Sequence, residues 1–229
     1  MATGQVQHAA ASFGTDGTPS PIRLGRDGSA IVRSQVEQLG MEGKIFIAGV
    51  GLEGSALTGL TALAETTPTI WLQAPSGGNV LVRPLWFEAL ISAEGGAAPD
   101  WYLSVVTASI AITTAGTAVT AQSIGKVGAS SAAILQTKPT TAAWTSAQNV
   151  RLRSSENALD NLISVEHANG ANTDKDDYMN RLTTIQYEFP FPLYLADGQA
   201  FAFHDATGTT AQDFEWILVY AEIDSAAHR

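Results

Sequence analysis

From Lys44 onward, short apolar runs alternate with clusters of residues that are typical of turns. The segment Ile185–Phe189 places apolar residues at every second position with polar residues between them, as a half-buried strand requires. Thr69–Leu72 is a continuous apolar run that ends at the turn-rich segment Pro75–Asn79. Read in this way, the chain contains about nine or ten strands, which is typical of an all-β protein. We therefore predict a two-sheet β-sandwich of the jelly-roll type.

A proline and a turn signal refine this prediction. Pro84 interrupts the apolar segment Val80–Ile91 and predicts a bend or an edge strand there, because proline cannot donate to a sheet ladder. Asp197 and Gly198 lie between two apolar runs and predict a hairpin turn. The one segment with helical spacing of apolar residues is Ser155–Glu166.

The first forty residues differ from the rest, since Gly, Ser, Thr and Asp dominate and apolar residues are sparse. Two short apolar pieces, Ile22–Leu24 and Ala30–Val32, flank the turn signal Arg26–Gly28. We predict an extended N-terminal arm with a short hairpin over residues 1–40 and a β-sandwich domain over residues 41–229. Whether the arm packs on its own domain or on a neighbour stays open.

Composition favours a subunit of an assembly. Charged residues make up only 15% of the chain, and a surface poor in charge is easier to bury against a neighbour. The formal net charge is −10 and no cationic cluster is present, so nucleic acid is not expected as a direct partner. The absence of cysteine excludes disulfides and thiolate metal sites. We find no signal peptide and no apolar stretch long enough to span a membrane, so we expect synthesis in a cytoplasm.

One motif challenges this interpretation. Gly49–Gly54 reads G-x-G-x-x-G directly after the predicted strand Lys44–Ile47, as in dinucleotide-binding folds. Such a fold needs an acidic residue at the end of its second strand, and here that strand ends in Gln73-Ala74-Pro75. A glycine-rich connection between two strands is the better interpretation, and no cofactor is expected.

The other candidate motifs are weaker still. Ser123–Lys126 matches S-x-x-K but lacks the companion motifs of penicillin-recognising enzymes. The acidic segment Asp174–Asp177 does not continue with EF-hand spacing. The four histidines do not form a zinc-binding pair, and we expect His204 and Asp205 to enter a surface turn. We therefore expect neither a metal site nor a catalytic site, and a protein that is not an enzyme.

Two residue types keep alternatives open. Glu88 and Glu188 each lie in an apolar strand and would be the candidates for a pair of glycosidase carboxylates. Three of the five tryptophans lie inside apolar strands and are expected in the core, whereas Trp101 and Trp144 are expected to be exposed and to mark contacts. Exposed tryptophans beside acidic residues would support a glycan-binding module.

Three stretches resemble virion structural proteins of tailed bacteriophages. These are the arm with the first core strand, the strand–turn–strand segment Ile70–Val82, and the segment Pro192–Phe201 together with the terminal strand Glu215–Glu222. They cover less than a third of the chain, and they resemble the family in turn chemistry more than in any active-site motif.

The resemblance implies a capsid decoration or cement protein with a jelly-roll-like fold that resides in the virion. It also implies a homo-oligomer, a trimer or dimer, in contact with the phage major capsid protein. A tail or head-fibre component and a jelly-roll glycan-binding module are the alternatives. The residues expected at assembly interfaces are Ile22, Leu24, Ile31, Val32, Trp101 and Trp144.

Overall fold

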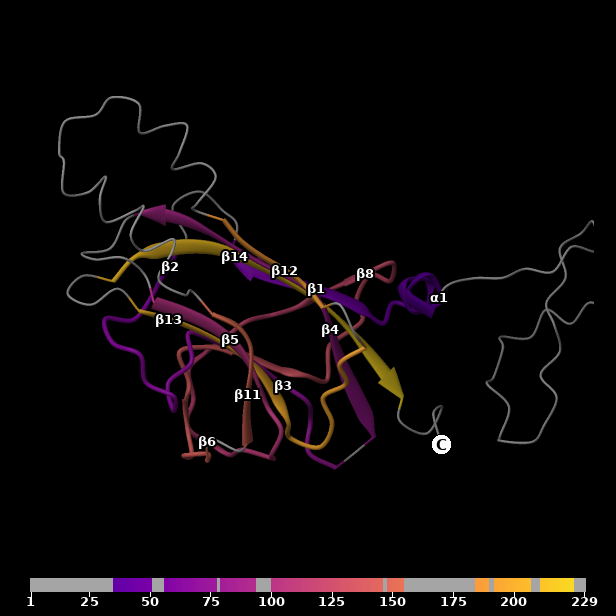
Figure 1. Cartoon of the computed structure of the whole chain (residues 1–229). Helices are drawn as coiled ribbons and strands as arrows, with labels where there is room; N and C mark the ends of the chain where they lie inside the picture. The colour runs from indigo at the N-terminus through magenta and orange to yellow at the C-terminus, as the bar shows by residue number, and fades with distance from the viewer. Residues whose placement is uncertain are drawn as a thin grey trace, which may run out of the picture.

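The described residues fold as an all-β sandwich, as the strand pattern predicted, and they include one short helix (Figure 1). The computed structural model describes residues 35–50, 56–77, 79–93, 100–145, 148–154, 184–189, 192–206 and 211–224. The predicted arm segment 1–34, the predicted helix Ser155–Glu166 and the acidic segment Asp174–Asp177 lie outside these residues.

Each of the two sheets has six strands in the described residues, and four of the six in each sheet form the framework of the sandwich. In the first sheet the spatial order is β12 (Thr184–Glu188), β4 (Val80–Ala93), β14 (Asp213–Asp224) and β1 (Ile45–Val50). In the second sheet it is β11 (Asn149–Ser154), β5 (Asp100–Val106), β13 (Ala200–Ala206) and β3 (Ile70–Gln73). Successive strands mostly cross from one sheet to the other, and the first and last strands pair with each other. This order of eight antiparallel strands is that of a jelly roll.

A long insertion separates β5 from β11, although these strands are antiparallel neighbours. It carries five short strands: β6 (Ile112–Thr114), β7 (Thr117–Ala118), β8 (Gln122–Ile124), β9 (Ile134–Thr137) and β10 (Thr140–Thr141). β8 extends the first sheet beside β1, β9 and β7 extend the second sheet beside β3, and β6 pairs with β10. A further short strand, β2 (Leu57–Thr58), pairs with the start of β14.

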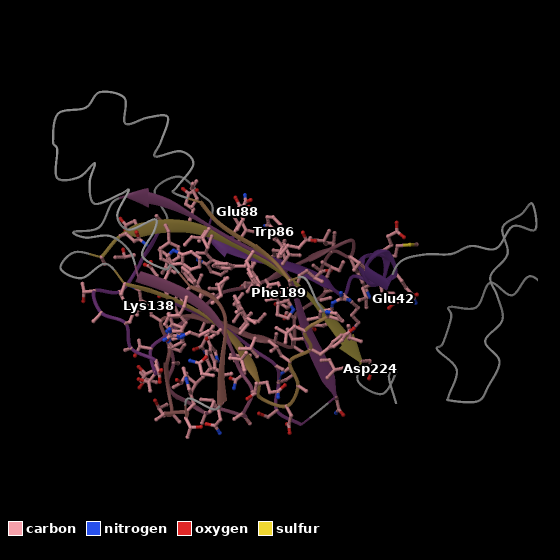
Figure 2. All side chains as sticks on the ribbon, viewed as in Figure 1. Glu42, Trp86, Glu88, Lys138, Phe189 and Asp224 are labelled. Carbon is pink, nitrogen blue, oxygen red and sulfur yellow. The ribbon has the colours of Figure 1, made fainter. Side chains whose placement is uncertain are left out.

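The main core lies between the two sheets. Alternate positions of β14 send Trp216, Leu218 and Tyr220 inward, where they meet Phe201 and Phe203 of β13. Ile185 is buried while Tyr187 and Phe189 of the same strand face are half-buried against this core, which confirms the alternation read from the sequence. Figure 2 shows Phe189 between the two sheets.

A second core covers the outer face of the second sheet. Trp71 of β3 stacks on Trp144 of the insertion, with ring centroids 5.7 Å apart and an interplanar angle of 18°. Gln73 anchors the insertion, because its side-chain amide donates to the carbonyls of Ile110 at 2.6 Å and Gly198 at 2.8 Å. The insertion therefore gives the second sheet two packed faces, and β3 and β13 are buried along their whole length.

The helix α1 (Gln35–Met41) covers one end of the outer face of the first sheet. Leu39 packs there against Ile45, Ala221 and Ile223. The expected boundary between arm and domain at residue 40 falls inside this helix, which packs on the sandwich. Its length explains why the hydrophobic pattern did not predict it, since seven residues give hardly two turns.

Two turn predictions meet different outcomes. Asp197 and Gly198 both have positive φ, at 44° and 82°, so a tight turn is present, but the predicted hairpin is not. Leu195 before it pairs with Val82 of β4 and not with β13, so the turn joins the two sheets. At Pro84, β4 has no partner residue in β12, whose pairing covers only Trp86 to Leu90, and the irregular pairing with β14 agrees with the bend that was one of the two predicted outcomes. The proline lies opposite Tyr220, where the pairing register of β4 and β14 shifts.

No helix within the described residues is long and apolar enough to span a membrane.

Candidate functional site

The two tryptophans predicted to be exposed are buried. Trp101 is 9% exposed and lies in the main core, and Trp144 is 6% exposed and lies in the second core. The expectation failed for Trp144 because the insertion folds back over the second sheet, which the spacing of apolar residues could not indicate. The other four predicted interface residues, Ile22, Leu24, Ile31 and Val32, lie outside the described residues.

The described residues of the G-x-G-x-x-G motif, and the serine of the S-x-x-K motif, lie in ordinary sheet structure. Gly49 and Val50 of the G-x-G-x-x-G motif belong to β1, paired with Ile217 and Trp216. Ser123 of the S-x-x-K motif lies in β8, not at a helix start, and its hydroxyl donates to the Gly43 carbonyl at 2.8 Å. Gly49, Val50 and Ser123 thus have structural roles in the sheet.

His204 and Asp205 are in strand β13 and not in the surface turn that the sequence suggested. Both are fully buried, and they face opposite sides of the second sheet. His204 enters the second core, where its ring stacks on Tyr102 at a centroid distance of 4.3 Å. The guanidinium of Arg151 lies over the ring of Tyr102, and its central carbon, Cζ, is 4.6 Å from the ring centroid.

This stack is rich in buried polar atoms. Within the described residues, hydrogen-bond partners are lacking for both ring nitrogens of His204, the Tyr102 hydroxyl, the Ser104 hydroxyl and the Trp144 indole nitrogen. Burial lowers the pKa of His204 to about 3, because the charged imidazolium is poorly solvated there; the backbone of Ala64 opposes this shift, and the charge of Arg151 adds to it. Burial also raises the pKa of Tyr102 to about 12. At neutral pH both rings are therefore uncharged, as aromatic stacking in a core favours.

Asp205 enters the main core. Its Oδ1 accepts a hydrogen bond from the Gln212 side-chain amide, while its Oδ2 has no partner among the described residues. Gly59 approaches so closely that an added Cβ would lie 2.2 Å from Oδ2. Burial raises the pKa of Asp205 to about 7, although the Gln212 hydrogen bond opposes the shift. The position is buried at the end of a packed strand.

Glu88 and Glu188 lie on neighbouring strands of the first sheet. In the register of β12 and β4, Glu188 pairs with Trp86, and Glu88 pairs with Gln186. The two carboxylates are therefore diagonal neighbours on one sheet face and project in the same direction.

That face is the outer face of the first sheet, and it contains the candidate surface. Six residues of β4 and β14 form a checkerboard that we call the outer-face patch: Trp86, Glu88, Leu90, Glu215, Ile217 and Val219. Leu90 and Ile217 are each 41% exposed, and the other four are half-buried. Figure 2 shows Trp86 and Glu88 on the side of the sheet that faces away from the second sheet. The sequence placed Trp86 in the core, because an apolar strand gives no signal for which of its faces is covered.

The cover over this sheet is incomplete. Helix α1 packs on the Ile45, Ala221 and Ile223 end, and Val219 at the edge of the outer-face patch packs against this cluster, whereas Leu90 and Ile217 remain 41% exposed. At its centre, Ile217 pairs with Glu88 on one side and with Gly49 on the other. Gly49 brings no side chain, and an added Cβ would lie 2.2 Å from the Trp216 carbonyl oxygen. On the β1 side, Ile217 therefore has no paired side chain beside it.

The comparisons with known proteins give no relative. No family model, no curated protein and no solved structure matches this chain. Within the described residues, no three histidine or acidic side chains come together in a group that could hold a metal ion.

Proposed function

We propose that this chain is a non-enzymatic structural subunit of a tailed-phage virion. Its role would be that of a capsid decoration protein, which associates with copies of itself and with the major capsid protein. The observation that carries the proposal is the outer-face patch, where a jelly roll presents exposed apolar residues on a sheet that its own helix covers only in part.

The asymmetry between the two sheets supports this proposal. The insertion covers the second sheet, so its outer face is packed within the chain itself. The first sheet keeps Leu90 and Ile217 in contact with water, and removing such side chains from water is the main driving force of association. The chain as a whole is poor in charge, at 15%, so burial of its surfaces elsewhere desolvates few ions, while Glu88 and Glu215 of the patch call for a partner of opposite charge.

A repeated particle surface increases the effect of a modest contact. A stable interface buries roughly 1,600 Å² in total, and many copies on one shell add avidity to each contact. A subunit of this kind needs complementary surfaces and no chemistry.

The mass of the purified protein in solution tests the proposal. Light scattering is expected to give a dimer or trimer at micromolar concentration, and electron microscopy with phage heads is expected to show density on the capsid surface. Density on a tail or on a fibre would support those alternatives and contradict the decoration role. A monomer that does not bind heads would overturn the proposal.

One observation favours a second candidate function, a glycan-binding module. Trp86 is half-buried on the outer face, and its indole nitrogen donates to the Glu88 carboxylate at 3.4 Å. An aromatic ring beside hydrogen-bonding groups is a common arrangement in sugar sites. A glycan array with the native protein and the Trp86→Ala variant decides this point, since a true site gives signals that the variant loses.

A further inference from the structure

The outer-face patch combines apolar side chains with one sign of charge. Glu88 and Glu215 belong to it, and Glu188 lies beside Trp86 on the neighbouring strand. Ile217, Val219 and Leu90 occupy the positions between them. Among the described residues of β4, β12 and β14 that flank or form the patch, from Trp86 to Leu90, Gln186 to Glu188 and Glu215 to Val219, no lysine or arginine occurs. Its complement is therefore a segment with apolar residues and positive charge.

Outside the described residues, the chain contains a segment with both features, although its three arginines are spread over twelve residues. Residues Ile22 to Arg33 hold three arginines, Arg23, Arg26 and Arg33, against one aspartate. That is a quarter of the 12 basic residues, in a chain whose formal net charge is −10. Between the arginines lie the apolar residues Ile22, Leu24, Ile31 and Val32. Both the charge and the apolar content of this segment match the patch.

The place where this segment joins the fold adds a second argument. Arg33 is separated by one residue from Gln35, the first residue of α1. Leu39 of α1 packs on the same outer face, against Ile45, Ala221 and Ile223. The arginine-bearing segment is thus continuous with the helix that covers the other part of that face.

We propose that the segment Ile22–Arg33 of one copy docks on the outer-face patch of a second copy. This inference rests on the proposed function, because it supplies the contact through which copies associate. The donor segment and the acceptor patch are different surfaces of one chain, so the contact is heterologous. Such a contact closes into a ring or continues from copy to copy.

The test uses the absence of cysteine from the full-length chain. The double variant Leu24→Cys with Ile217→Cys forms a disulfide only where the two β-carbons come within about 4 Å. Mild oxidation is expected to give chains linked between copies, seen as dimers and higher species on a non-reducing gel. A mixture of the two single variants should give dimers as well, because in that mixture the link can form only between chains.

A matched control separates docking from random encounter. Val127, in the turn after β8, is fully exposed and lies outside the patch, so Leu24→Cys with Val127→Cys offers an equally accessible thiol. It should give far less linked product at equal times. Adding Arg23→Glu and Arg26→Glu to the Leu24→Cys, Ile217→Cys double variant reverses two charges of the segment. This change should lower the fraction of linked chains roughly tenfold. Adding Glu188→Arg and Glu215→Arg to this charge-reversed variant should restore part of the linked fraction.

The outcomes are distinguishable. Equal linking at Ile217 and Val127, or linking only within one chain, overturns the inference. If light scattering still shows an oligomer in that case, the proposed self-association stands and uses another surface. A monomer that gives no link between copies overturns both.

Discussion

His204 and Asp205 are consecutive residues whose side chains enter two different cores, and burial moves their pKa values in opposite directions. The pKa of Asp205 rises from 3.8 to about 7, whereas that of His204 falls from 6.5 to about 3. A raised carboxyl pKa stabilises the fold below pH 4, and this contribution is lost as the pH rises to 7. A lowered imidazole pKa acts in the reverse sense, since its contribution is present above pH 6.5 and is lost toward pH 3.

The first prediction isolates the carboxyl. In Asp205→Asn, the part of the free energy of unfolding that falls between pH 4 and pH 7 should disappear, an effect on the order of a few kcal/mol. Urea denaturation at several pH values measures it. Val127→Ala, at a fully exposed turn, provides the control, because it removes no titratable group and should leave the pH profile as in the native protein. An unchanged profile in Asp205→Asn would show that Asp205 is ionised in the fold without penalty.

A second prediction at this scale concerns Trp144, whose ring stacks on Trp71. Trp144→Ala should lower the free energy of unfolding by about 3–5 kcal/mol, because it leaves a cavity in the second core. Val127→Ala, at an exposed turn, should change it by less than about 0.5 kcal/mol. Denaturant unfolding compares the two. A Trp144→Ala protein with native stability but altered oligomeric mass would instead return this residue to the interface role that the sequence suggested.

Among the elements, α1 links the predicted arm to the sandwich. Deleting residues 1–34 should leave the midpoint of thermal unfolding unchanged, because α1 and its contact through Leu39 remain. Deleting residues 1–40 should lower the free energy of unfolding by about 2–4 kcal/mol, since Ile45, Ala221 and Ile223 lose their cover. Leu39→Ala should reproduce most of that loss in the full chain. Calorimetry of the three variants makes the comparison, and equal stability of both truncations would contradict the packing role of α1.

The sequence predicted the elements better than their contacts. The alternation at Ile185–Phe189, the apolar run at β3 and the turn at Asp197 were each correct because they depend on local chemistry. The cover over the second sheet was not predictable, since it depends on pairing between residues distant in the chain. Trp71 and Trp216 are buried as predicted, but Trp86 and Trp144 were assigned to the wrong environments for the same reason, since they differ in which sheet face is covered and not in local pattern.

At the scale of the whole molecule, self-association through the outer-face patch has an apolar and an electrostatic contribution, and two experiments separate them. Ile217→Lys should weaken association at least tenfold while the unfolding midpoint stays the same, because Ile217 is 41% exposed in the single chain. Val127→Lys adds the same charge at an exposed turn away from the patch and should leave association unchanged.

Salt then distinguishes the electrostatic from the apolar contribution. Exposed charges are screened within about 3 Å at 1 M salt, against about 10 Å at 0.1 M. If arginines meet the glutamates of the patch, sedimentation at rising NaCl should show weaker association of the native protein. The Arg23→Glu and Arg26→Glu variant should instead associate weakly at low salt and improve as salt screens the repulsion. Association of the native protein that salt leaves unchanged or strengthens would mean that apolar burial alone holds the copies together.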